Sequence, residues 1–203
     1  RKLFRNSADS DDDCQGHETK MIGLKSSGAR IFAFLTLCLL LHAATSAFIL
    51  TTLNYPTSND EYKHLSYVFQ VERDRQLFPD YHDLYLAAPE KAGVPLSKRS
   101  DLKHPAFFYW LMTPLADPEQ SAAENAARFR IANFILSVIA VGIFLFASAR
   151  LLNSPGALVT YGLTVVAFPF LAVVGGTFNN DNLALLGAAL AFMGVVRMAR
   201  GEI

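Results

Sequence analysis

Two adjacent acids, Asp60 and Glu61, follow the first long apolar run of the chain, and His64 comes one helical turn after Asp60. A charged side chain is costly inside a bilayer, so an ionisable cluster at the edge of an apolar run is a functional hypothesis. Residues four apart share one face of a helix, and a carboxylate and an imidazole placed in this way can share a divalent metal ion or a proton. We therefore take Asp60 as a candidate catalytic base, and Asp60 and His64 as candidate metal ligands.

Local helix chemistry offers a second account of the same cluster. Ser58 followed three residues later by Glu61 fits a capping box, and an acid in the first turn favours the positive end of a helix dipole. Capping accounts for Glu61 but not for His64, so capping and function both stay open for Asp60.

A basic cluster, Lys103-His104-Pro105, precedes the aromatic run 106–112. Pro105 suits the first position of a helix, whose free N–H groups would then face the preceding loop. Lys103 and His104 at such a helix start are candidates for binding a lipid-linked phosphate, and the alternative is a basic side chain that extends to the headgroups. Arg128 precedes the second apolar run and either reaches an anionic headgroup or anchors its helix.

A third cluster, Asn179-Asn180-Asp181, precedes the last apolar run. Asn and Asp are preferred N-cap residues, so the cluster fits a helix start. Asp181 is also a candidate partner for Asp60, because two carboxylates from separate loops suit a divalent cation or an acid/base pair. We therefore keep Asp181 as a candidate catalytic and metal-ligating residue beside the capping account.

Long uncharged runs must position these clusters. Apolar residues make up 52% of the 203-residue chain and its net charge is zero, which argues against nucleic acid as a partner. Four runs have about the length of a membrane span, so we predict an all-α, polytopic membrane protein with about four transmembrane helices. The runs cover residues 31–53, 131–149, 155–174 and 183–198. His42, a lone polar residue in the first run, is expected to bond to a neighbouring helix.

The basic residues near the ends of these runs predict an orientation. If every run crosses once, they all fall on one side, which the positive-inside rule assigns to the cytoplasm. The residues are Lys25, Arg30, Arg150, Arg197 and Arg200. Asp60, His104 and the loop 177–182 then share the other, external side.

The remaining segments are polar. We expect residues 1–29 to be a disordered cytoplasmic tail, followed by a transmembrane domain over residues 30–203. Residues 54–130 are expected to form a long external loop that carries two amphipathic helices along the membrane surface, one over Tyr62–Phe69 and one over residues 105–112. The protein is expected in a bacterial inner membrane or a plasma membrane.

These clusters, in this order, resemble the GT-C superfamily of integral membrane glycosyltransferases, and within it the protein O-mannosyltransferases and the aminoarabinose transferase of lipid A. The likeness rests on Asn59-Asp60-Glu61 with His64, on the segment from Lys103 to Leu111, on Arg128, and on Asn179-Asn180-Asp181. It covers about residues 31–200, and members of that superfamily usually have more spans, so the chain looks like the N-terminal part of one.

The resemblance implies transfer of a sugar from a polyprenyl-phosphate-linked donor to an acceptor on the external face. Asp60 would act as the base or as a metal ligand, and Asp181 would help to organise the site around a divalent metal ion. The phosphate of the donor would be held by Lys103, His104 and Arg128. Two alternatives remain, an ion- or solute-coupled transporter that uses Asp60, Asp181 and His42, and a membrane scaffold whose acids only cap helices.

Overall fold

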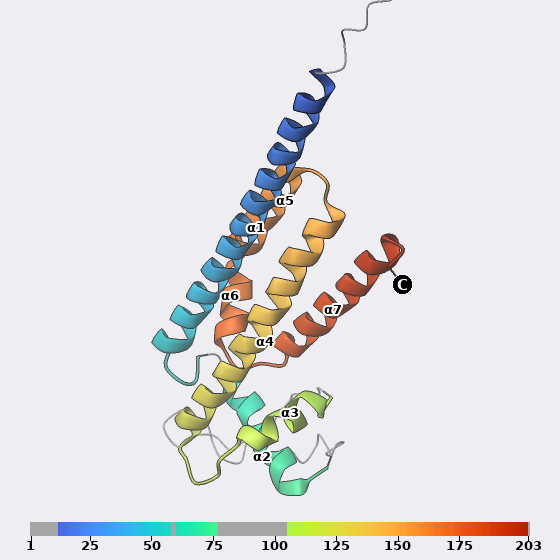
Figure 1. The fold of residues 1–203 in the computed structure, drawn as a ribbon. Helices are drawn as coiled ribbons and strands as arrows, with labels where there is room; N and C mark the ends of the chain where they lie inside the picture. Colours follow the sequence, from blue (N-terminus) through green and yellow to red (C-terminus); the bar gives the residue numbers. More distant parts are fainter. Residues whose placement is uncertain (1–11, 58–59, 77–104, 203) are drawn as a thin grey trace, which may run out of the picture.

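The structure is a computed structural model that describes residues 12–57, 60–76 and 105–202, with side chains from residue 28 onward. Every regular element in these residues is helical, as Figure 1 shows, which confirms the predicted all-α class. The helices are α1 (Asp12–Thr52), α2 (Glu61–Asp74), α3 (Phe107–Met112), the short 3₁₀ helix η3 (Thr113–Leu115), α4 (Ala122–Leu151), α5 (Pro155–Ala167), α6 (Pro169–Gly176) and α7 (Asp181–Ala199).

Among the described residues, three helices are long and apolar enough to cross a membrane, namely Gly28–Thr52 of α1, α4 and α7. A fourth apolar stretch is divided between α5 and α6, which meet at an angle of 52°. Pro169 is the first residue of α6, and proline cannot donate the backbone hydrogen bond that would continue α5. The prediction of about four spans therefore agrees with the structure, except that the third is broken.

Two helices begin earlier than their apolar runs. Helix α1 begins at Asp12, so residues 12–29 are an extension of the first span and not a disordered tail. Extending an existing helix costs much less than nucleating a new one, and this segment contains strong helix formers such as Met21 and Leu24. Helix α4 begins at Ala122, nine residues before the apolar run, because Ser121 caps it.

The chain runs in the same direction along α4 and α7. Near their beginnings, the Asn133 amide donates to the carbonyls of Thr177 and Asn179, at 3.0 and 2.7 Å. At their ends, Arg200 donates to the carbonyl of Arg150 at 2.8 Å. The bent α5–α6 pair therefore returns the chain from one end of the bundle to the other, as a single crossing would (Figure 1).

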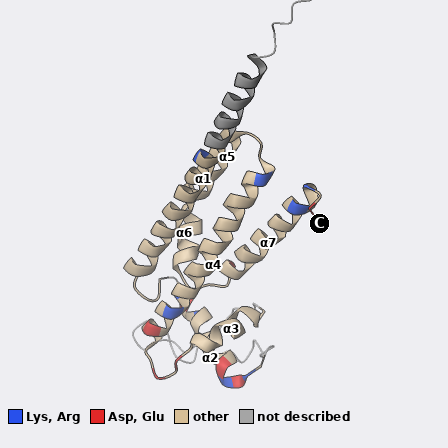
Figure 2. Cartoon of the chain, in the orientation of Figure 1, with Lys and Arg blue, Asp and Glu red and all other residues tan. Residues whose placement is uncertain are grey.

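Charges gather at the two ends of the bundle. Figure 2 shows the spans almost free of Lys, Arg, Asp and Glu along their length, whereas the last turns of α4 and α7 carry Arg150 and Arg197. Helices α2 and α3 pack together at the opposite end, where α4 and α7 begin (Figure 1). The predicted grouping of basic residues thus holds for these two spans, and their assignment to the cytoplasm stays a prediction.

The bent span packs closely against α1. A side chain added at Gly176 would lie 2.6 Å from the Ile49 side chain, and one at Gly175 would lie 2.8 Å from the Ser46 hydroxyl. Small residues allow such close approach of helices inside a membrane. His42 of α1 is buried and lies 3.1 Å from the Ser137 hydroxyl of α4, so the expected bond to a neighbouring helix is confirmed.

Candidate functional site

The end of the bundle that carries α2 and α3 is organised by a buried ion pair. Arg130, in the third turn of α4, is 4% exposed, and Glu61, the first residue of α2, is completely buried. The guanidinium binds the carboxylate through two bonds, from Nε to Oε1 and from Nη2 to Oε2, each 2.7 Å long. This two-point geometry is the strong form of an arginine–carboxylate pair.

The same two side chains connect four parts of the chain. Arg130 donates from Nη1 to the carbonyl of Leu53 at 2.7 Å and from Nη2 to the Thr57 hydroxyl, and both acceptors lie between α1 and α2. Glu61 accepts from the backbone N–H of Thr57 at 2.7 Å and from that of Phe178 at 3.2 Å, between α6 and α7. With these bonds both charges are well satisfied, which buried ions require.

This arrangement corrects the predicted capping box. Ser58 lies outside the described residues, while Glu61 is the first helical residue and not the third, and its carboxylate is bound to Arg130. Helix α2 has Asp60 as its N-cap residue, and that side chain makes no capping hydrogen bond. Sequence reasoning had assigned Glu61 to a local role because the partner of its carboxylate lies 69 positions away.

Tyr55 lies beside this ion pair. Burial raises the pKa of its phenol well above the usual value, the negative charge of Glu61 raises it further, and Arg130 opposes them. Its hydroxyl oxygen is buried and has no hydrogen-bond partner among the described residues. Burial and the charge of Glu61 thus both favour the neutral phenol at Tyr55.

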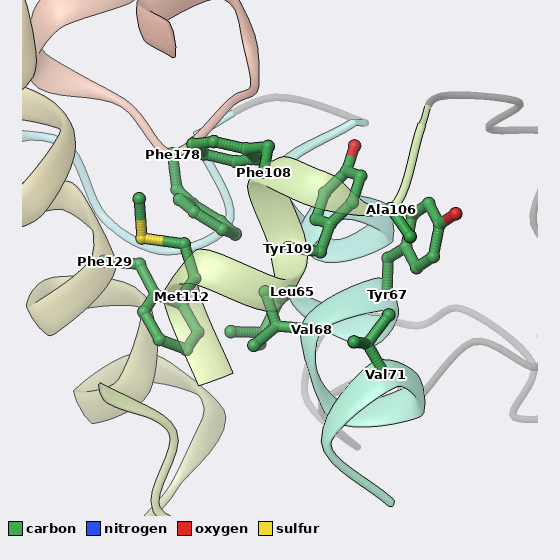
Figure 3. Close-up of a cluster of buried hydrophobic side chains, with 10 residues drawn as sticks. All are labelled: Leu65, Tyr67, Val68, Val71, Ala106, Phe108, Tyr109, Met112, Phe129 and Phe178. Carbon is green, nitrogen blue, oxygen red and sulfur yellow. The ribbon is translucent and has the colours of Figure 1, made fainter. Parts of the chain in front are cut away.

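An aromatic core lies between α2, α3, the start of α4 and the segment before α7 (Figure 3). The Tyr67 and Tyr109 rings stack with centroids 3.9 Å apart, and Phe178 packs against Phe129 at 4.8 Å. Such ring pairs stabilise a core beyond the area that they bury. Helix α2 thus exists where a helix was expected, and its apolar side packs on protein. Its position along a membrane surface stays a prediction.

His64 belongs to this core. Its Nδ1 lies 2.7 Å from the Tyr109 hydroxyl, the two rings stack at 5.8 Å, and the imidazole is only 5% exposed. Asp60 is directed elsewhere, since its carboxylate lies 3.2 Å from the Lys63 ammonium. The described residues contain no group of three or more His, Cys, Asp or Glu side chains placed to hold a metal ion. Asp60, His64 and Asp181 do not form such a group as their side chains stand.

The two candidate catalytic acids are exposed and belong to neighbouring segments. The side chain of Asp60 is 64% exposed, and the next residue in the chain is the buried Glu61. Asp181 begins α7, so the cluster stands at a helix start as predicted; the N-cap residue Asn180 makes no side-chain capping bond, and the Asp181 N–H donates to the Asn179 side chain at 3.0 Å. Because Glu61 binds the N–H of Phe178, and three residues span at most about 11 Å, Asp181 lies within about 11 Å of the Phe178 backbone.

The candidate phosphate-binding residues divide into two groups. Lys103 and His104 lie outside the described residues. Arg128 is described and its Nη1 lies 3.4 Å from the Asp117 carboxylate, with 42% of its side chain exposed. Exposed pairs of this kind contribute little to stability, so Arg128 can exchange Asp117 for another anion.

Known proteins offer no guide to this site, since no family model, curated protein or solved structure was found to match the chain. The geometry itself has one simple consequence. An exposed carboxylate, Asp60, is attached directly to a residue that is fixed by four hydrogen bonds. A side chain next to a residue that is fixed in this way can be held in a defined position relative to a second reactant.

Proposed function

We propose that the protein is a membrane glycosyltransferase that moves a sugar from a polyprenyl-phosphate-linked donor to an acceptor on the external face of a bacterial inner membrane or a plasma membrane. The observation that carries this proposal is the bond between the Glu61 carboxylate and the Phe178 N–H, because it joins the segments of Asp60 and Asp181 at one end of a membrane bundle. The resemblance to GT-C enzymes supplies the substrate class, and α2 and α3 would lie at the membrane surface there.

The proposed reaction is a single displacement. Asp60 takes the proton of an acceptor hydroxyl, and the acceptor oxygen attacks the anomeric carbon of the donor. The bond from that carbon to the phosphate oxygen breaks, and the polyprenyl phosphate leaves with inversion at the anomeric carbon. Positive groups stabilise the leaving phosphate, and Arg128, Lys103 and His104 are proposed for this role.

The neighbours of Asp60 support its role as a base. Lys63 lies 3.2 Å from the Asp60 carboxylate and is largely buried, so it orients the carboxylate without covering it. The backbone N–H of Thr57, three residues before Asp60, donates to the carboxylate of Glu61, and Arg130 binds the same carboxylate. In this proposal Asp60 is the reacting group, whereas Glu61 and Arg130 position it.

The test uses Asp60→Asn in the full-length protein. The amide keeps the size of the side chain but is not a base, so sugar transfer should fall to background while folding and membrane insertion are unchanged. The matched control is Glu119→Gln, an exposed acid that precedes α4. Transfer from polyprenyl-phosphate mannose and polyprenyl-phosphate aminoarabinose is measured in vesicles, and wild-type turnover by Asp60→Asn would rule out the proposed base.

A non-catalytic scaffold is the second candidate, and one observation favours it. The hydrogen bonds of Glu61 and Arg130 are those of a well-satisfied structural connection, and a pair of Asp60 with Lys63 is usual at the start of a helix. Mass spectrometry of lipid that co-purifies with the full-length protein separates the two. A polyprenyl phosphate supports the transferase, and its absence together with no transfer from either donor supports the scaffold.

A further inference from the structure

The opposite end of the bundle carries a groove that the proposed reaction does not use. It lies between the C-terminal halves of α4 and α7 and has a volume of about 310 Å³. Its walls are apolar and include Phe146 of α4 and Met193 of α7, whereas Arg150 and Arg197 lie at the ends of the same two helices. The groove is therefore apolar along the spans and cationic at the end of the bundle.

The charges at the mouth of this groove are unbalanced. Glu202 lies 3.2 Å from Arg150, 3.9 Å from Arg197 and 3.0 Å from Arg200. Among the described residues, these three arginines share one carboxylate, which leaves two positive charges in excess there. About half of each arginine side chain is exposed, with values of 54%, 45% and 48%, so each can bind another anion.

The length of the groove fits one leaflet of a membrane. From Gly142 to Arg150 is eight residues, or about 12 Å along a helix. Half of a hydrocarbon core of about 30 Å is about 15 Å. A chain that enters from the arginine end would therefore extend along most of one leaflet before it reached the end of the groove.

We propose that this groove binds an anionic phospholipid, with an acyl chain between α4 and α7 and the phosphate at Arg150 and Arg197. The charge favours an anionic lipid over a zwitterionic one, because a zwitterionic lipid would not compensate the two excess positive charges. A basic surface near a membrane attracts anionic headgroups, and the apolar walls hold the chain. The site lies at the opposite end of the spans from Asp60, so it is independent of the proposed transfer reaction.

The test measures which lipid the full-length protein retains. The protein is placed in vesicles of equal parts phosphatidylglycerol and phosphatidylcholine, extracted, and examined by native mass spectrometry. Wild type should retain phosphatidylglycerol in preference, and Arg150→Gln with Arg197→Gln should lower that preference by about fivefold for each arginine removed. Substitution of both arginines by Lys should keep most of it, and Glu202→Gln should increase it.

Two further variants distinguish a lipid bound in the groove from a general attraction of anionic lipids to a basic surface. Arg73→Gln with Arg75→Gln also removes two positive charges, but from exposed positions at the end of α2, and should leave the preference unchanged. Met193→Trp fills the groove and keeps both arginines, so it should lower phosphatidylglycerol retention. Melting temperature and gel filtration confirm that each variant is folded.

Three results would overturn the proposal. Equal retention of the two lipids by wild type would remove the role of charge. An unchanged preference in the Arg150→Gln and Arg197→Gln variant, or in Met193→Trp, would remove the groove as the site. Lipid-free dimers that form with rising protein concentration, and that Met193→Trp dissociates, would assign the groove to a second copy of the chain.

Discussion

The sequence pattern Ser-x-x-Glu occurs twice, and the two glutamates have different roles. At Ser121–Glu124 both halves of a capping box form, since the Ser121 N–H donates to the Glu124 carboxylate at 2.9 Å and the Ser121 hydroxyl accepts from the Glu124 N–H. At Ser58–Glu61 the glutamate is the first helical residue, and it binds Arg130 in the interior. One glutamate is exposed to water and the other is fully buried.

The difference lies in what is available across space. Arg128 lies one turn beyond Glu124 on the same exposed helix start, and the Glu124 carboxylate accepts from the Ser121 N–H. Glu61 lies opposite Arg130, whose long side chain would otherwise be a buried charge without compensation. The same local pattern therefore serves as a cap at the surface and as an ion pair in the interior.

The largest difference between the two sites is expected for Glu61→Ala. It leaves Arg130 buried without a counter-ion and removes an acceptor from two backbone N–H groups, so the free energy of unfolding should fall by about 3–5 kcal/mol. Glu124→Ala should have a much smaller effect, because water can replace the lost hydrogen bonds. Both are measured by unfolding in mixed detergent micelles. Similar losses in the two variants would contradict the distinction between a cap and a buried pair.

The double variant Glu61→Met with Arg130→Met tests whether the two buried side chains stabilise the fold as a pair. Removing both charges leaves no buried ion, so its loss of stability should be at least about 1 kcal/mol smaller than the sum of the two single substitutions to Met. Some loss should remain, since the N–H groups of Thr57 and Phe178 then lack their acceptor. Additive losses in a double-mutant cycle would show that the two side chains act independently.

The capping box itself is tested by Ser121→Ala. Loss of an N-cap side chain costs about 1 kcal/mol, so the unfolding free energy should fall by that amount and the first turn of α4 should exchange its amide hydrogens faster. The comparison is Ser154→Ala, since Ser154 caps α5 through one weaker bond of 3.5 Å and should matter less. Hydrogen exchange followed by mass spectrometry measures the protection of the amide hydrogens in the first turns of α4 and α5. Equal protection in wild type and Ser121→Ala would exclude the cap.

The smallest effect is a pH dependence at Glu124. Hydrogen bonds from the Ser121 side chain and backbone lower the pKa of this carboxyl below its usual 4.5 in the folded protein. A lowered pKa stabilises the fold above pH 4.5, and the gain is lost as the pH falls through the folded value. Wild type should thus exceed Glu124→Gln in stability at neutral pH, and the two should converge below that value. A constant difference across the acid range would contradict this.

Much of the fold follows from composition alone. Four apolar runs predicted the spans, because a bilayer leaves few alternatives to a helix of about 20 apolar residues. The ends were less accurate, since Ala122 begins α4 through a cap that belongs to a polar segment. The 52° bend was missed although Pro169 stands in the middle of the third run, where proline is the usual cause of a break.

The site was predictable only where a role is local. The helix start at Asp181 follows from the neighbouring asparagines and was anticipated, whereas the pairing of Glu61 with Arg130 depends on how α1, α2 and α4 meet. The environment of His64 was missed for the same reason, because Tyr109 comes from a separate helix 45 positions away. The sequence carried one signal for the ion pair, namely Arg130, which stands directly before an apolar run, because an arginine next to a span needs a counter-ion.

The close approach of α6 to α1 limits how the sequence can change over evolution. At Gly175 and Gly176 even a single methyl group would collide with Ser46, Ser137 or Ile49, whereas Gly187 and Gly194 of α7 have open space around them. Gly175 and Gly176 should therefore be conserved among related sequences, whereas Gly187 and Gly194 should vary. Distantly related sequences can therefore be recognised by two features. One is a glycine pair at the end of a bent span, and the other is a glutamate and an arginine, far apart in sequence, that are substituted only together.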